Sequence, residues 1–383
     1  MAPKSDKPTR VGLPAARTFA FLGALLFLVA ATPVLSRWLR AVELLQGLTQ
    51  KHRGLAASEA VESDLVEREV TLPLLGRGVR ARLYSKSGAR GPGLVLAHGV
   101  HYAGIDEKRL IPFARELSRA GFTVLTPELR DIADYRITRD SLDVLVESVR
   151  YLSERRDWIS GERVGLMGFS FAGGLSLVAA TDPRLDNRLS FVTSVGGHHD
   201  LERVLHFFTR NQIDTPRGVS NLKAHEYGLA VLVYDSLDRF VPTEDRPIMR
   251  QALKAWLMED RPRARAAASQ RVTHEAEHLF QLLEGERLHE LAPELERVIV
   301  ERRPELEALS SRGHLARSRV PIHLLHGTGD TVIPPSETEW AAKELGTAPH
   351  EALVSPLLEH VEVNQVAGFS EQVKLVGFVA AML

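Results

Sequence analysis

The chain has 383 residues, of which 44% are hydrophobic and 25% charged, enough for a globular domain with a full core and one large insertion. Its 48 Lys and Arg residues nearly balance 49 Asp and Glu residues, so no global field would draw nucleic acid to it, and nucleic acid is not an expected partner. The chain contains no cysteine, which excludes disulfides, thiolate metal sites and a cysteine nucleophile.

An uncharged stretch near the N-terminus predicts membrane targeting. Residues 18–36 carry no charge, lie between Arg17 and Arg37, and are mostly Leu, Ala, Phe and Val. At about 1.5 Å per residue, a helix of this length just reaches across a bilayer. Two interpretations stay open: a membrane anchor, or a signal peptide cleaved after the small residues Val29 and Ala31. The rest of the chain is expected outside the cytoplasm, either anchored or secreted, although basic residues on both flanks leave the orientation open.

Residues 37–64 are interpreted as an amphipathic connector. Trp38, Leu39, Val42 and Leu45 recur at helical spacing, which predicts a short helix at the membrane surface or packed on the following domain. From residue 65 the apolar period changes to two, and residues 66–75 and 79–85 predict an antiparallel hairpin around the turn 76–78.

Short apolar runs then alternate with helical patterns. This alternation predicts an α/β fold with a mostly parallel sheet and helices on both faces. The predicted strands are 93–97, 122–127, 163–168, 189–195, 320–325 and 352–355, and the predicted helices are 107–120, 141–158, 171–180, 336–345 and a closing helix.

The alternation stops between residues 198 and 317, which we interpret as an inserted helical cap. Helical patterns such as 248–257 and 272–283 fill this stretch, and Pro262, Pro293 and Pro304 are expected helix breaks. The core is therefore expected in two parts, residues 65–197 and 318–383.

Ser170 is the candidate nucleophile. A serine hydroxyl attacks a carbonyl only when a base activates it, and a sharp strand-to-helix turn is a place where it can be presented. Such a turn needs small neighbours, and Gly168 and Ala172 meet that need, although glycine is the usual residue at the second position. The alternative is an ordinary turn with a serine that caps the helix.

The negative oxygen formed by attack on a carbonyl needs backbone N–H donors. We assign them to Phe171, which follows the serine, and to Val100, which follows a predicted strand and Gly99. The neighbouring His98 and His101, and His198 at the start of the cap, are candidate substrate contacts. For His198 the alternative is a polar residue at a cap hinge.

The candidate acid and base follow the serine in the order that this architecture uses. Asp330 lies in a turn after the predicted strand 320–325, and His360 follows one helix and one strand later. Asp330 would orient the His360 ring, which would take the proton of Ser170. Asp238, in a segment that faintly repeats the Asp330 segment, is a rival acid.

The sequence resembles the α/β-hydrolase superfamily, and within it the lysophospholipase and dienelactone-hydrolase-like branches. The resemblance rests on LVLAHG (94–99), GFSFAGG (168–174), HGTGDTVIP (326–334) and EH (359–360). It implies an eight-stranded, mostly parallel sheet, a triad of Ser170, Asp330 and His360, and hydrolysis of an ester or related acyl bond with no metal or organic cofactor. Ala172 and the long insertion depart from the family pattern.

Three functions are compatible with these residues. The first is an esterase. The membrane segment and the apolar cap suggest a substrate that is lipid-like or otherwise hydrophobic. A serine peptidase or amidase would use the same triad, and a binding protein without activity would use only the fold. The sequence does not predict an oligomeric state.

Residues 274–278 match H-E-x-x-H, a zinc-binding pattern when it lies on a helix. The polar flanks and the charge at Glu277 favour a solvated cap helix instead, so no metal site is predicted.

Overall fold

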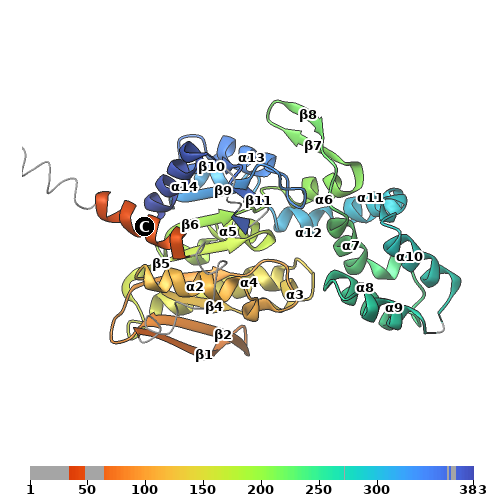
Figure 1. Cartoon of the computed structure of the whole chain (residues 1–383), viewed down its shortest axis with the longest axis horizontal. Helices are drawn as coiled ribbons and strands as arrows, with labels where there is room; N and C mark the ends of the chain where they lie inside the picture. The colour runs from red at the N-terminus through yellow and green to blue at the C-terminus, as the bar shows by residue number, and fades with distance from the viewer. Residues whose placement is uncertain (1–33, 48–63, 271, 360–361, 364–367) are drawn as a thin grey trace, which may run out of the picture.

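The computed structural model describes residues 34–47, 64–270, 272–359, 362–363 and 368–383 (Figure 1). No helix within these ranges is both long and apolar enough to cross a bilayer. The segment predicted to enter the membrane, residues 18–36, lies almost wholly outside the described residues.

The centre of the molecule is an eight-stranded sheet in the order β1-β2-β4-β3-β5-β6-β9-β10. Strand β2 pairs antiparallel with both β1 and β4, and the remaining neighbours pair parallel. The predicted eight-stranded, mostly parallel sheet is therefore confirmed. The strands are β1 (Leu65–Leu74), β2 (Arg77–Lys86), β3 (Pro92–Ala97), β4 (Thr123–Pro127), β5 (Ser160–Phe169), β6 (Leu189–Val195), β9 (Ile322–Gly327) and β10 (His350–Ser355).

The hairpin at the sheet edge turns one residue earlier than its glycines suggested. The turn consists of Leu75 and Gly76, both with positive φ (53° and 71°), and β2 already begins at Arg77. Two residues of positive φ match the right-handed twist of an antiparallel pair. Leucine at the first position gave no signal for such a turn, since leucine rarely adopts positive φ.

Alternate residues of the buried strands point to opposite faces, and each face has its own helical layer. Leu94 and Leu96 of β3 pack with α2 (Leu110–Arg119), α14 (Phe369–Met382) and the helix formed by residues 34–47. Val95 and Ala97 of the same strand pack on the other face, in the layer of α4 (Arg139–Glu154), α5 (Phe171–Ala179) and α13 (Ser336–Leu345).

The insertion between β6 and β9 forms the cap, and it lies beyond the carboxyl ends of the strands, at one end of the molecule's long axis (Figure 1). The helix of residues 34–47 lies at the other end. A small hairpin within the cap, β7 with β8, had no predicted counterpart. The cap elements are α6 (Leu201–Arg210), β7 (Gln212–Thr215), β8 (Gly218–Asn221), α7 (Glu226–Asp235), α8 (Arg246–Leu257), α9 (Arg261–Ala268), α10 (His274–Glu284), α11 (Ala292–Glu301) and α12 (Arg303–Ala308).

Candidate active site

Ser170 forms the turn between β5 and α5. Its backbone angles are φ 54° and ψ −132°, which an L-residue rarely adopts. The Ser170 N–H donates to the Val195 carbonyl at 2.8 Å, and this bond fastens the turn to the end of β6. The residue is only 5% exposed. The fold therefore holds one serine in a strained conformation at the carboxyl edge of the sheet.

The strand and helix on either side of Ser170 approach so closely that small residues are required. A Cβ atom at Gly168 would lie 2.3 Å from the carbonyl oxygen of Ala172, and one at Gly173 would lie 2.9 Å from the carbonyl oxygen of Gly168. Ala172 itself is fully buried. Gly168 is thus the position that tolerates no side chain, and the methyl group of Ala172 is accommodated.

The loop after β3 lies directly beside the serine. A Cβ atom at Gly99 would lie 3.4 Å from the Cβ atom of Ser170. Phe171 is the first residue of α5, and a helix offers no internal acceptor to its first N–H group. The two segments that carry the predicted oxyanion donors, Phe171 and Val100, are therefore adjacent.

Asp330 is held in the turn after β9. One carboxylate oxygen accepts hydrogen bonds from the N–H groups of Val332 (2.8 Å) and Ile333 (3.0 Å). The other lies 3.3 Å from Nε2 of His326, and Asp330 as a whole is only 1% exposed. These contacts fix the carboxylate at the carboxyl edge of the sheet, on the loop where the sequence predicted an acid.

His360 lies outside the described residues. The strands β11 (Leu358–Glu359) and β12 (Glu362–Val363) pair antiparallel on either side of it in the sequence. The Thr328 N–H of the acid loop donates to the carbonyl of Ser355 at 3.2 Å. The acid loop thus touches the end of β10, from which the chain continues towards the predicted base.

The cap closes over these loops through the start of α7. The His225 N–H donates to the carbonyl of Thr331, next to Asp330, at 2.9 Å. The Tyr227 hydroxyl donates to the carbonyl of Val100 at 3.3 Å. One end of one helix therefore contacts both the acid loop and the oxyanion loop. No sequence signal marked Tyr227, because a single tyrosine in an apolar helical pattern is indistinguishable from a core residue.

The three histidines predicted as substrate contacts differ in their surroundings. The His98 ring is buried, and its Nε2 accepts a hydrogen bond from the Leu129 N–H at 3.0 Å. Its Nδ1 lies 2.9 Å from the carbonyl of Gly99. Burial lowers the pKa of His98 to about 4. His198 is fully buried against Gly174, with Nε2 2.9 Å from the carbonyl of Leu309. Both rings are buried and bind backbone groups, so their assignment as substrate contacts stays a prediction.

His101 is half-buried at the boundary of core and cap. Its Nδ1 accepts a hydrogen bond from the Ala103 N–H at 3.2 Å, and burial lowers the pKa of the ring. Of the three histidines, only His101 has a partly open position from which it could contact a substrate.

The structure weighs against both rival sites. Asp238 is exposed in the cap, in a single 3-10 turn between α7 and α8, whereas Asp330 is buried beside the loops of the serine site. His274 and His278 are exposed on α10 with ring centroids 6.5 Å apart. Over the described ranges no cluster of three His, Asp or Glu side chains is suited to hold a metal ion.

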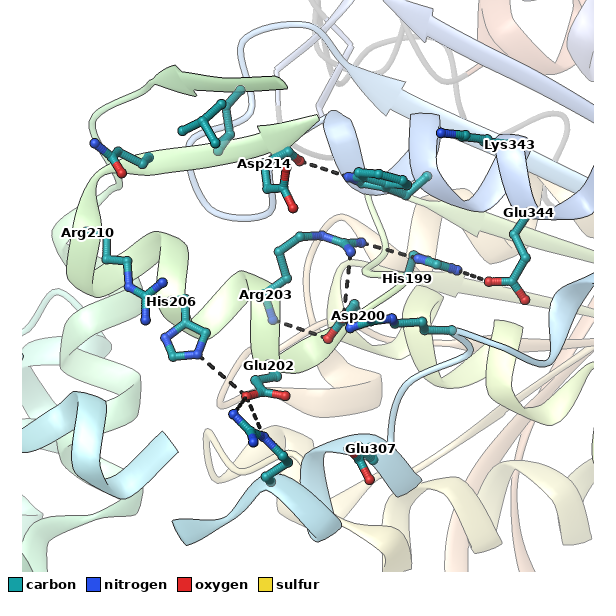
Figure 2. Close-up of a pocket in the computed structure, with 16 residues that line it drawn as sticks. His199, Asp200, Glu202, Arg203, His206, Arg210, Asp214, Glu307, Lys343 and Glu344 are labelled. Atoms are coloured by element: carbon teal, nitrogen blue, oxygen red, sulfur yellow. Dashed lines mark hydrogen bonds and ion pairs between the residues drawn. The ribbon is translucent and has the colours of Figure 1, made fainter. Parts of the chain in front are cut away.

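A large cavity lies away from Ser170. It has a volume of about 900 Å³, and neither Ser170 nor Asp330 lines it (Figure 2). Its walls come mainly from α6, the β7–β8 hairpin, α12 and α13. Around Trp340 they carry acidic side chains, an equal number of Arg and Lys side chains, and two histidines. By contrast, the cavity beside Phe171 measures about 20 Å³ and has mainly apolar walls.

A buried carboxylate next to the large cavity holds the cap to the core. Glu337 of α13 is fully buried and accepts hydrogen bonds from the N–H groups of His199 (2.9 Å) and Asp200 (2.8 Å) and from the Arg203 guanidinium (2.6 Å). The Ser311 N–H donates to the carbonyl of His199 at 3.0 Å, so the segment that enters the cap and the segment that leaves it also bind each other. His199 and Asp200 are therefore a fixed point at which the cap joins the core.

Burial alone would raise the pKa of Glu344, which lies on the wall of the large cavity. Hydrogen bonds from the His199 ring and from the N–H groups of Gly313 and Leu315 outweigh burial and lower this pKa to about 2. Figure 2 shows His199 between Arg203 and Glu344. The polar groups along this wall are thus used to hold the cap.

No protein-family model and no curated protein matches the chain. Among solved structures, it is similar to an esterase from Pyrobaculum calidifontis (13% identity, 90% of each chain, TM-score 0.45). An acetyl xylan esterase from Paenibacillus sp. R4 gives 13% identity, 90% of this chain and 92% of the other, and a TM-score of 0.44. An acylaminoacyl peptidase from Pyrococcus horikoshii gives 13% identity over 81% of this chain and a TM-score of 0.43, and this chain spans only 38% of the length of the peptidase.

The serine at the turn after β5 and the buried aspartate after β9 both lie where parallel strands of the sheet end. These two positions are combined with an eight-stranded sheet of the order given above. This is the arrangement of the α/β-hydrolase fold, and the chain has that fold.

Proposed function

We propose that the protein is a serine hydrolase that cleaves a carboxylic ester through an acyl-enzyme on Ser170. The observation that carries the proposal is the strained turn at Ser170, with φ 54°, against which the oxyanion loop packs at Gly99. Backbone strain of this kind costs about 1–3 kcal/mol and persists where a site requires it. A serine that only capped a helix would adopt an ordinary extended conformation.

In the proposed reaction the Oγ atom of Ser170 attacks the carbonyl carbon while His360 accepts its proton. Asp330 orients the His360 ring, and the N–H groups of Phe171 and Val100 stabilise the oxygen that becomes negative. The bond to the alcohol breaks, and His360 gives the proton to the departing alcohol. Water then attacks the acyl-enzyme with His360 again as base, which releases the acid and restores the serine.

The closed cap determines when this reaction can begin. The contacts of Tyr227 with Val100 and of His225 with Thr331 join the cap to both loops, and Ser170 is only 5% exposed, so we expect the start of α7 to move when substrate enters. The two hydrogen bonds are each worth about 0.5–1.5 kcal/mol, which thermal motion can break. We therefore expect the cap to open and close during turnover.

The test is covalent labelling of the full chain in detergent with a fluorophosphonate probe, which reacts only with an activated serine. Ser170→Ala and His360→Ala are expected to abolish labelling. Asp330→Asn is expected to slow it by about 10⁴-fold, because the base would then be held in the wrong tautomer.

Asp238→Asn is the matched control, and it is expected to label at the rate of the parent. Loss of labelling in Asp238→Asn but not in Asp330→Asn would contradict the assigned acid. A folded parent that does not react at all would contradict the proposed function. An ester and an amide with the same acyl group then separate an esterase from an amidase.

A further inference from the structure

The helix formed by residues 34–47 has two different faces. Ala41 and Leu44 are buried in the cluster that also contains Leu375 and Phe378 of α14, so this face is fixed to the catalytic core. The first turns of the helix instead expose large apolar side chains. They are Val34, Leu35, Trp38 and Leu39, which we call the apolar patch.

The patch is unusual for this molecule. Eleven large hydrophobic residues are exposed in the described part of the chain, and four of them fall within these six positions. Exposed apolar groups that cluster in this way mark an interaction surface, whereas scattered ones do not. Arg37 and Arg40 are exposed on the same turns.

The chain that precedes the patch identifies what covers it. The uncharged stretch of residues 18–36 runs without interruption into Val34 and Leu35. Tryptophan at the border of an apolar segment and basic residues beside it are the composition of a membrane interface, and anionic headgroups attract arginine there. A protein partner would require neither feature.

We propose that the apolar patch lies in the interface of an anionic lipid bilayer, and that the catalytic domain stands on the membrane at this end with its cap facing the water. Because Ala41 and Leu44 pack on the core, the helix transmits its orientation to the whole domain. The cap lies at the opposite end of the long axis (Figure 1).

This orientation, together with the proposed function, assigns a substrate class. An ester dissolved in the bilayer would meet the end of the domain that has no active-site loops. The loops beside Ser170 and Asp330 contact the cap through Tyr227 and His225, and the cap lies at the end away from the apolar patch. The substrate is therefore a water-soluble ester.

The absence of cysteine makes the orientation directly measurable. The full chain is reconstituted in vesicles of phosphatidylcholine and phosphatidylglycerol with one nitroxide-labelled cysteine, either Leu39→Cys in the patch or Val300→Cys in the cap. The two positions are matched in exposure, at 56% and 52%. Relaxation by oxygen, which concentrates in lipid, is compared with relaxation by a water-soluble nickel chelate.

The label at position 39 is expected to respond mainly to oxygen and the label at position 300 mainly to nickel. Equal access of nickel to both labels would overturn the proposal that the apolar patch lies in the membrane. Recovery of the folded chain free of vesicles would overturn it as well, and so would a dimer that shields position 39 from both reagents. Lipid exposure of position 300 would overturn the outward-facing cap.

The substrate class is tested in the same vesicles with p-nitrophenyl acetate in the water and a palmitoyl diglyceride in the bilayer. Cleavage of the acetate alone is expected. Cleavage of the diglyceride at a comparable rate would overturn the substrate class. Cleavage of neither would overturn the proposed function and the substrate class with it, while the label measurements, which need no catalysis, would still decide the membrane surface.

Discussion

Replacing Ser170 by glycine should stabilise the protein relative to replacing it by alanine. Both variants remove the nucleophile, so their difference isolates the backbone. At φ 54° and ψ −132° a residue with a Cβ atom carries about 1–3 kcal/mol of strain, which alanine keeps and glycine loses. Glycine costs about 0.5–1 kcal/mol through the greater freedom of the unfolded chain. The net expectation is that Ser170→Gly is more stable by about 1 kcal/mol.

The assay is equilibrium unfolding in urea, with the free-energy difference taken from the midpoint shift and the slope. Ala266→Gly is the control, because Ala266 is exposed within α9, where the same exchange of alanine for glycine should destabilise by about 1 kcal/mol. The two comparisons thus have opposite signs. If Ser170→Ala is instead the more stable variant by about 0.5–1 kcal/mol, the turn carries no strain, and the main support for the proposed nucleophile is lost.

Three further changes have defined outcomes. Gly168→Ala places a methyl group 2.3 Å from the Ala172 carbonyl, so it should cost about 1–3 kcal/mol and sharply slow fluorophosphonate labelling; unchanged labelling would contradict the close packing of the turn. Glu337→Gln leaves the largely buried Arg203 with only its longer ion pair to Asp200 (3.5 Å), and should cost about 3–5 kcal/mol in urea unfolding. Glu339→Gln removes an exposed pair and should change stability by less than about 1 kcal/mol. The pKa of Glu344 is lowered to about 2, so the stability that this carboxylate contributes is complete above about pH 4.5 and is lost as the pH falls towards 2. Glu344→Gln should therefore flatten the dependence of unfolding free energy on pH between about 4.5 and 2. Above that window the pH dependence should run parallel to that of the parent.

Much of the core could be predicted because its signals are local. The predicted strand 189–195 and helix 336–345 match β6 and α13 residue for residue, since a buried strand shows as a continuous apolar run and a helix as a period of 3.6. Boundaries shifted where a polar residue continues an element, as at the start of α4, which begins at Arg139 and not at residue 141.

The site was predictable only where chemistry imposes a sequence pattern. Glycine at position 168 is required by contact with the next helix, and Asp330 is required to accept two backbone N–H groups of its own turn, so both leave a local trace. The role of Tyr227 depends on a contact with Val100, which is far away in the sequence. The surroundings of His98 and His198 were unpredictable for the same reason: their backbone partners, at Leu129 and Leu309, are distant in the sequence.

The place of the cap in the chain governs how the protein is made. Strand β6 pairs with β5 on one side, but its other neighbour is β9, which the ribosome produces only after the whole insertion, since Val192 pairs with Ile322. During synthesis, β6 is therefore an apolar strand with an unpaired edge, a structure prone to associate with other chains. The bond between the Ser311 N–H and the His199 carbonyl brings the ends of the insertion together, so a folded cap delivers β9 to its place. The insertion that covers the serine thus also determines when the nascent sheet can close.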